Sequence, residues 1–440
     1  MRHRHEIKNV GGTQMLLLPL PMRCLLTISA AFALLITSLQ AAAGSEEQLS
    51  LTRRVVIASQ IYSAIQLYFG HWKGVPDFDL DKEYRAYVEQ IISSDDRRAF
   101  DFATMDFVAK LQNGHSGFGD KWLRDNFGQR LGFDAILVDG QWVVTRSSVT
   151  QLKVGDILTS IDGQSLESFY RQQRKYIGAS DERWRRRTLF EYPYLFPEQF
   201  DLGLSDGRTV HITRSGEFQW PGSEYAANET SVKEGIAWIH IPAFSPRRFE
   251  DSAVEFLRNL TNVQALVLDL RGNHGGSTPQ TLVRSLMDRP YKFFNESTPA
   301  TIGLWQVWNG IDSHTELSWQ PEVERPDKPL YSGPLYLLID GGCFSACEDA
   351  VVSFKDNHRA TIIGEQTAGS TGQPYFRELE DGMAIQLSTK REYFPDGSQF
   401  EGIGIKPDIE VHTTAEDIRS GRDPVMARAL KLIAIGPTKQ

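Results

Sequence analysis

The stretch from Leu335 to Phe354 constrains the fold most, because it predicts a buried strand, a turn and a helix in direct succession. Leu335–Ile339 is apolar throughout, as in strands that a parallel sheet buries on both faces. Asp349–Phe354 is typical of the beginning of a helix. Ser345 would then lie on the corner, beside the unpaired N–H groups of the first helical turn. Such a corner presents a nucleophilic serine, although a serine that only caps a buried helix has the same pattern.

Two other segments contain residues suited to the same chemistry. Ala265–Leu270 predicts a second buried strand, and Arg271–Gly276 adds a glycine turn whose N–H groups can face a ligand. An amphipathic helix is expected to end near Gly114, and His115 follows it on the loop. A histidine held in this way is a suitable general base.

With these segments and two later ones, the chain resembles the tail-specific (C-terminal processing) serine peptidase family, in its tricorn-like branch. The matching segments, between residues 55 and 412, read Asp269-Leu-Arg-Gly-Asn-His-Gly-Gly276, Phe344-Ser-Ala-Cys-Glu348, Gly364-Glu-Gln-Thr-Ala-Gly369 and Asp396-Gly-Ser-Gln-Phe-Glu-Gly-Ile-Gly-Ile-Lys-Pro-Asp408. The resemblance implies an α/β core of the crotonase-like, Clp-type spiral kind. It also implies serine peptidase chemistry without a cofactor or a metal.

The resemblance assigns the catalytic roles. Ser345 matches the nucleophile, His115 the general base and Glu401 the acid that orients the imidazole. Many members instead carry a lysine directly after the segment that ends at Gly369. This chain has Ser370 there, so the resemblance does not extend to a Ser–Lys dyad.

Several assignments stay open at this point. In the tricorn-like branch a serine adjoining the histidine helps to orient it, and Ser116 can do so only if its loop differs from that of the family. His274, in the glycine turn, is a rival base. Glu348 and Glu365 are interpreted as structural, but either could replace Glu401.

The turn around the serine raises two further expectations. The N–H of Ala346, with that of Gly275 or Gly276, is expected to form the oxyanion hole. Cys343 and Cys347 flank the serine, and they are either a disulfide or two buried thiols.

The 440 residues suggest several domains of a multidomain α/β protein. We expect a signal peptide in 1–43, a helical segment in 46–125, a PDZ-like β-rich domain in 128–215, the peptidase core in 231–415 and a C-terminal helix or tail in 416–440. The helical segment should contain helices over Arg53–Phe69, Lys82–Ser94 and Asp96–Leu111. In the PDZ-like part, Leu131, Gly132 and Phe133 match the carboxylate-binding loop, and the alternative is a packing module without a ligand.

Composition limits the partners. A formal net charge of -9 argues against a nucleic-acid partner, and a peptide or protein substrate is expected; the sequence does not reveal the oligomeric state. The signal peptide predicts a periplasmic or secreted protein with no stable membrane span after cleavage, and an uncleaved anchor is the alternative. The arginines around Trp184 are interpreted as a solvated helix face, or as a surface that steers acidic partners. A catalytically silent binding protein and an esterase are the alternative functions.

Overall fold

The computed structural model describes residues 48–219, 225, 227–300, 316–326 and 328–436. The predicted signal peptide, 1–43, lies outside the described residues. None of the helices within these ranges is long and apolar enough to pass through a membrane.

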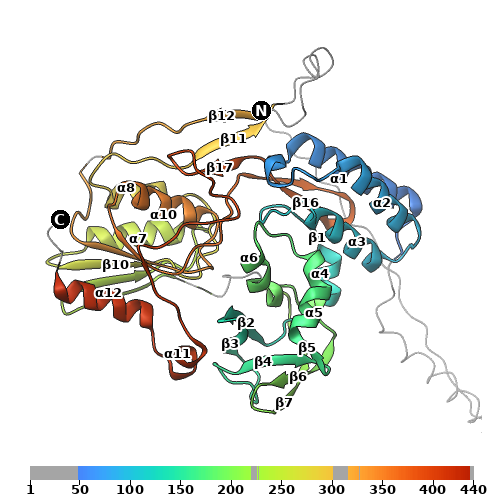
Figure 1. The fold of residues 1–440 in the computed structure, drawn as a ribbon, viewed down its shortest axis with the longest axis horizontal. Coiled ribbons are helices and arrows are strands. Elements are labelled where there is room, and N and C mark those ends of the chain that lie inside the picture. Colours follow the sequence, from blue (N-terminus) through green and yellow to red (C-terminus); the bar gives the residue numbers. More distant parts are fainter. Residues whose placement is uncertain (1–47, 220–224, 226, 301–315, 327, 437–440) are drawn as a thin grey trace, which may run out of the picture. The chain divides into compact units, whose positions relative to one another are not determined.

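A six-stranded sheet lies in the C-terminal half of the chain, in the order β18-β14-β13-β10-β9-β8. Figure 1 labels its central strand β10. Its strands are β8 (Glu229–Lys233), β9 (Ile236–His240), β10 (Ala265–Asp269), β13 (Leu335–Ile339), β14 (Thr361–Gly364) and β18 (Ile409–Glu410). The neighbours from β9 to β18 pair in parallel, and β8 pairs antiparallel with β9. The two apolar runs that predict buried strands are β10 and β13, and every residue of both is buried.

Helices cover both faces of this sheet. Side chains alternate between the two faces along each strand, so the apolar strands have apolar side chains to bury on each face. The helices are α7 (Arg248–Arg258), α8 (Gln280–Leu286), α10 (Ala346–Asp356) and α12 (Pro424–Ile435). Leu266 and Leu268 belong to the hydrophobic core with α7, α8 and α10. Val267 and Leu338 pack on the other face with Val425 of α12. A mainly parallel sheet between two helical layers confirms the expected α/β class.

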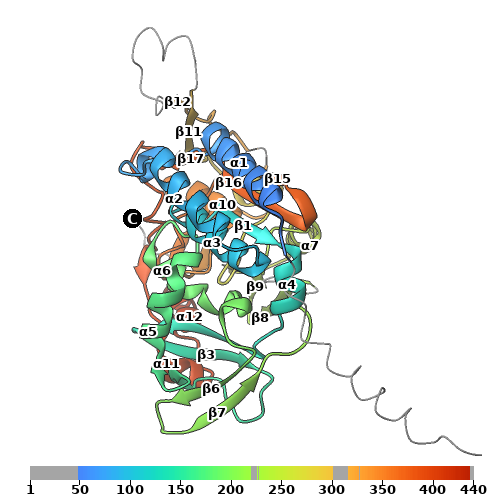
Figure 2. The same cartoon turned by 90° about the vertical axis from the view of Figure 1, so that its right-hand side faces the viewer.

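The N-terminal part contributes helices and one strand that reaches the C-terminal part. Its helices are α1 (Leu51–Tyr68), α2 (Leu80–Ile92), α3 (Arg97–Ala109) and α4 (Lys121–Phe127). Strand β1 (Gly117–Asp120) pairs antiparallel with β16 (Met383–Ser388), which pairs with β15 (Pro374–Glu378). Figure 2 shows α1 to α3 in blue beside these C-terminal strands. Because β1 follows His115 closely, this pairing fixes the histidine loop against residues more than two hundred positions away.

The region predicted as PDZ-like contains an antiparallel sheet in the order β2-β3-β4-β6-β7. Its elements are β2 (Phe133–Val138), β3 (Gln141–Ser147), β4 (Ile157–Ile161), β5 (Gln164–Ser165), α5 (Leu166–Gln173), α6 (Glu182–Arg187), β6 (Gln199–Leu204) and β7 (Thr209–Thr213). Strand β2 lies at one edge of this sheet, and α6 contacts it. The remaining elements are a small sheet of β11 (Asn295–Pro299), β12 (Glu316–Trp319) and β17 (Arg391–Tyr393), and helix α11 (Ala415–Ser420).

Candidate active site

Ser345 lies on the corner between β13 and α10, with its hydroxyl directed at a histidine. Its backbone has φ 59° and ψ −127°, which is unusual for a residue that is not glycine. Its N–H donates to the Ser370 carbonyl at 3.1 Å, and it also lies 3.3 Å from the carboxylate of Glu348. Oγ of Ser345 lies 2.9 Å from Nε2 of His115. A strained backbone that aims a hydroxyl at an imidazole is the geometry of a nucleophile.

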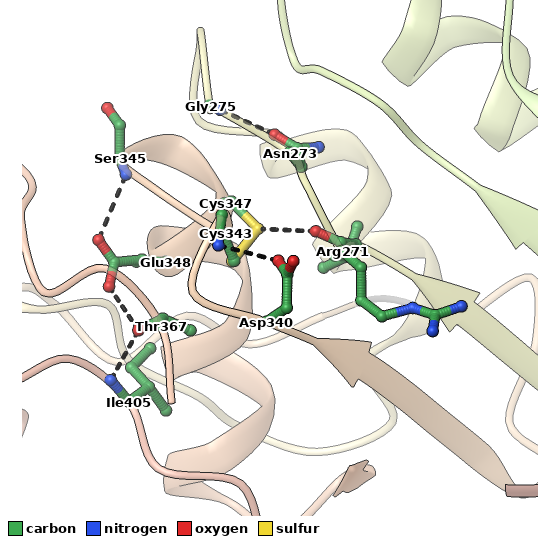
Figure 3. Close-up of a disulfide and its surroundings, with 12 residues drawn as sticks. Arg271, Asn273, Gly275, Asp340, Cys343, Ser345, Cys347, Glu348, Thr367 and Ile405 are labelled. Atoms are coloured by element: carbon green, nitrogen blue, oxygen red, sulfur yellow. Dashed lines mark hydrogen bonds between the residues drawn. A yellow bond between two sulfur atoms is a disulfide. The ribbon is translucent and has the colours of Figure 1, made fainter. Parts of the chain in front are cut away.

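A disulfide joins the two cysteines that flank Ser345 in the turn (Figure 3). Cys343 and Cys347 form a disulfide with a Cα–Cα distance of 5.4 Å, and both are fully buried. The structure therefore decides between the two expectations for this pair in favour of the disulfide. The Asp340 carboxylate accepts N–H bonds from Gly272 at 2.8 Å and Gly342 at 2.9 Å, which ties the turn to the glycine loop after β10.

The glycine loop touches the serine turn at Gly275. A Cβ on this residue would lie 2.6 Å from the Phe344 carbonyl oxygen and 2.7 Å from Cβ of Ser345. The φ of Gly275 is also positive, at 89°, so only glycine fits here without displacing the serine.

The imidazole of His115 is buried and held on three sides. Its ring stacks on that of Phe344 at 4.4 Å, and Phe344 stacks on Trp184 at 4.4 Å. Nδ1 lies 3.2 Å from Oγ of Ser370. Burial, together with the positive charge of Lys390, lowers the pKa of His115 to about 3. The ring is therefore neutral at physiological pH and free to accept a proton.

Ser370 is the functional residue that the sequence-based reasoning missed. It occupies the place of the family's lysine, and it bonds the ring nitrogen that faces away from Ser345. Its own N–H donates to the Glu348 carboxylate at 3.0 Å. The signal was present, since a side chain that replaces a catalytic lysine occupies the same position in the site.

Glu401 lies behind Ser370 and does not hydrogen-bond the imidazole. Its Oε1 accepts the N–H of Thr371 at 3.2 Å, and Oε2 has no hydrogen-bond partner among the described residues. Burial, and then the nearby carboxyl of Glu392, raise the pKa of Glu401 well above its usual value. The expected contact between Glu401 and His115 is thus replaced by one through the Ser370–Thr371 backbone, because Ser370 fills the position beside the ring.

The other two glutamates and Ser116 have structural contacts. Glu348 is fully buried and accepts bonds from Thr367 Oγ1 at 2.5 Å and from Gly369 N–H at 2.7 Å. Burial raises the pKa of Glu348 to about 8. Glu365 accepts a bond from Thr413 N–H at 3.2 Å and takes no part in this cluster.

Ser116 does not orient the imidazole, which corrects that expectation. Its hydroxyl donates to Oδ1 of Asn113 at 3.1 Å and accepts the N–H of Ser388 at 3.2 Å. The Ser388 contact fastens the histidine loop to β16, whereas the Asn113 contact lies within that loop. The hydrogen bond that Ser116 could offer to the ring comes from Ser370 instead.

Two N–H groups remain as oxyanion donors. The N–H of Gly275 donates to Oδ1 of Asn273 at 2.8 Å, which removes Gly275 from the expected set (Figure 3). The N–H groups of Ala346 and Gly276 donate to no other group of the described residues. His274, the rival base, has its ring 5.8 Å from that of Trp184, while His115 holds the bond to Ser345.

Helix α6 is not the solvated face that its arginines suggest. Trp184 is buried, and it covers Phe344 beside the serine. Arg187 pairs with Asp340 at 3.0 Å, and Arg183 donates to the Ile403 carbonyl at 2.8 Å. The cluster therefore binds α6 to the serine turn and to the loop of Glu401.

The predicted carboxylate-binding loop is partly a core element. Leu131 and Phe133 are 3% and 5% exposed, so their side chains pack inward. Gly132 has a φ of 81°, and its carbonyl accepts the N–H of Ser148 at 2.8 Å. Across the described ranges, no group of three or more metal-ligating side chains is gathered in one place.

Comparison with known proteins finds a match to one peptidase family over part of the chain. Residues 235–411 match the model of Peptidase family S41. A carboxy-terminal-processing protease of Bartonella bacilliformis is 29% identical over 207 residues, which cover 45% of this chain and 44% of that protein. The chain thus spans less than half the length of this relative.

Solved structures agree with the fold. Mature CPAF superimposes with a TM-score of 0.65 at 16% identity, covering 88% of this chain and 99% of CPAF. The photosystem II D1 C-terminal processing protease gives 0.51 at 18% identity, covering 84% of this chain and 98% of that one. At these identities the likeness shows the fold, and it confirms the expected α/β core.

Proposed function

We propose that this chain, whose residues 235–411 match the model of peptidase family S41, is a serine peptidase in which Ser345 is the nucleophile and His115 the general base. The observation that carries the proposal is the 2.9 Å contact between Ser345 Oγ and His115 Nε2. This contact forms on a strained corner next to the N–H of Ala346, which donates to no group of the described residues, and acyl transfer needs this combination.

The proposed reaction has two halves. Neutral His115 takes the proton of Ser345 as Oγ attacks the peptide carbonyl, and the N–H groups of Ala346 and Gly276 receive the oxyanion. His115 then gives that proton to the leaving amine, which departs as the C–N bond breaks. In the second half, His115 takes a proton from water as the water oxygen attacks the acyl carbon. The bond between that carbon and Oγ then breaks, Oγ of Ser345 takes the proton back from His115, and the product leaves with a new carboxyl group.

Ser370 and Glu401 support the imidazole in this scheme. While His115 acts as base, Nδ1 carries the hydrogen and donates it to Oγ of Ser370, 3.2 Å away. That bond becomes charge-assisted when the imidazolium forms, so it strengthens toward the transition state. Glu401 holds the backbone of the adjoining Thr371, and so acts on the base through this segment.

Recognition of substrate C-termini is a second part of the proposal. Within the described residues, β2 pairs only with β3, so its other edge can accept an added peptide strand. N–H groups near Gly132 would then bind the terminal carboxylate. Intact protein should prefer peptides with a free, apolar C-terminus over their amides by about tenfold or more. Equal turnover of the paired peptides would show that region 128–215 is a packing module that does not bind C-termini.

We also propose that the protein is exported. The Cys343–Cys347 disulfide supports this, because disulfides persist in oxidising compartments such as the periplasm or the outside of the cell. Export would be carried by the predicted signal peptide in 1–43. Sequencing the mature N-terminus of protein from the native compartment tests it, and an intact N-terminus at residue 1 would favour the anchor.

A fluorophosphonate probe tests the catalytic proposal directly. The probe should label the wild-type protein at Ser345, as mapped by peptide mass spectrometry. Ser345→Ala should lose labelling, and hydrolysis of labelled casein should fall about 10³-fold or more. Ser353→Ala is the matched control, because Ser353 lies in α10 and is fully buried, and among the described residues its hydroxyl bonds only the Asp349 carbonyl.

The outcomes separate the alternative functions. A folded wild-type protein without labelling would support a silent binding protein and overturn the proposal. Labelling of Ser345 with turnover of esters but not of casein or peptides would indicate an esterase.

A further inference from the structure

His71 is a buried histidine beside the site that the proposed mechanism does not use. It follows α1, and its side chain is 4% exposed. Nε2 lies 2.8 Å from Oγ of Ser388, and Nδ1 lies 4.0 Å from Oε2 of Glu401. The preceding Gly70 donates its N–H to the Ser388 carbonyl at 2.8 Å. The end of α1 is therefore part of the wall behind the catalytic centre.

The contacts of Ser388 fix which nitrogen of His71 carries the hydrogen. A serine hydroxyl has one hydrogen, and that of Ser388 is donated to the Lys390 carbonyl at 3.1 Å. The Ser388 oxygen must then accept from Nε2–H of His71. Burial, and then the charge of Arg391, lower the pKa of His71 to about 3, so the ring stays neutral. The lone pair of Nδ1 consequently faces Glu401.

Oε2 of Glu401 is the polar atom that faces the lone pair of His71 Nδ1. Oε2 of Glu401 is buried and has no hydrogen-bond partner among the described residues, which is costly for a polar atom. Burial and the nearby carboxyl of Glu392 raise the pKa of Glu401, which favours its protonated form. A protonated Oε2 can donate, and Nδ1 of His71 lies 4.0 Å from it, so a hydrogen bond between them requires an approach of about 1 Å.

These contacts close a ring around the catalytic imidazole. Ser116, next to His115, binds Ser388 at 3.2 Å, and Ser388 binds His71. From His71 the ring continues through Glu401, the Thr371 N–H and Ser370 back to Nδ1 of His115.

We propose that His71 is a positioning residue, which holds the Glu401 carboxyl against the Ser370–Thr371 segment and thereby fixes the orientation of His115. The inference rests on the serine peptidase function proposed above. It predicts that the Nδ1 side of the ring, which faces Glu401, matters more for catalysis than the Nε2 side, which faces Ser388.

Two amide replacements separate the two sides of the ring. Asparagine places a polar atom near the Nδ1 position, whereas the longer glutamine places one near Nε2. We expect His71→Gln and His71→Ala to lower kcat for labelled casein about tenfold or more at an unchanged KM. His71→Asn should stay within about threefold of the wild type. The rate of fluorophosphonate labelling of Ser345 should follow the same order.

The reverse order would indicate a purely structural anchor on Ser388. Any result in which His71→Asn is no better than His71→Gln, or in which His71→Ala keeps the wild-type kcat, overturns the inference. If the wild type is not labelled at all, the proposed function fails as well. If the wild type is labelled normally and the His71 variants are labelled at the same rate, the inference about His71 is overturned but the proposed function is not.

A double-mutant cycle keeps the test decisive if His71→Ala does not fold. Glu401→Gln and His71→Gln should each lower kcat, and the double variant should lose no more than Glu401→Gln alone, because both act through one contact. Losses that multiply would show two independent effects and would overturn the pairing of His71 with Glu401.

Discussion

Replacing Ser370 by alanine should slow the acylation of Ser345 about 10- to 150-fold. Oγ of Ser370 is 3.2 Å from Nδ1 of His115, the nitrogen that shares the positive charge once the imidazole takes the serine proton. A hydrogen bond to a charged group contributes about 1.5–3 kcal/mol, and about 1.36 kcal/mol changes a rate tenfold. The loss should appear in kcat and not in KM, because the bond strengthens only as charge develops.

The rate of fluorophosphonate labelling measures this effect without a known substrate. Ser370→Ala and Ser353→Ala each remove one fully buried hydroxyl, so their thermal midpoints report the cost of a lost buried hydrogen bond. Only Ser370→Ala should slow labelling. A folded Ser370→Ala protein that is labelled at the wild-type rate would show that stacking on Phe344 alone orients His115, and the assigned role of Ser370 would be wrong.

Five further substitutions test the same site by activity and labelling assays on folded variants. His115→Ala should be nearly as damaging as loss of the nucleophile, whereas His274→Ala should be mild; the opposite order would exchange the two roles. Lys390→Gln removes a positive charge that lowers the pKa of His115, so the acid limb of the pH–rate profile should move to higher pH, and an unmoved limb contradicts this. Gly275→Ala should reduce labelling about tenfold or more, since its Cβ would lie 2.6 Å from the Phe344 carbonyl and displace the serine turn; a normal rate would mean that the turn yields freely. Trp184→Leu should slow labelling about 2- to 12-fold, the worth of one aromatic pair, and no change would reduce the stack to packing.

Local sequence patterns were sufficient to predict the two buried strands and the corner at Ser345. Residues 335–339 are apolar at every position and residues 265–269 at every position except Asp269, as expected for strands buried on both faces. Ser345 follows one such run, so its corner could be expected from neighbouring residues alone. His115 could be named for a related reason, since the end of a helix fixed its loop. The family resemblance then joined the two residues.

The supporting contacts could not be predicted, because they join distant parts of the chain. His115 and Ser370 are 255 positions apart, and no local pattern distinguishes Ser370 from any buried serine. Glu401 was expected to orient the base directly, but its carboxyl accepts the N–H of Thr371 instead, the residue after Ser370. Gly275 failed as an oxyanion donor for a more local reason, because Oδ1 of Asn273 accepts its N–H in a tight side-chain turn.

Helix α6 shows how composition alone misleads, and it limits how substrate recognition can be tested. A tryptophan among arginines suits a solvated face, yet here Trp184 covers Phe344, and Arg187 pairs with Asp340, 153 positions away. Both partners belong to the serine turn. Deleting region 128–215 would therefore strip the catalytic centre of these contacts, whether or not the region binds peptides. Inactivity of such a truncation would say nothing about recognition. Paired acid and amide peptides tested on the intact chain leave α6 in place, so a difference between them can come only from the terminal carboxylate.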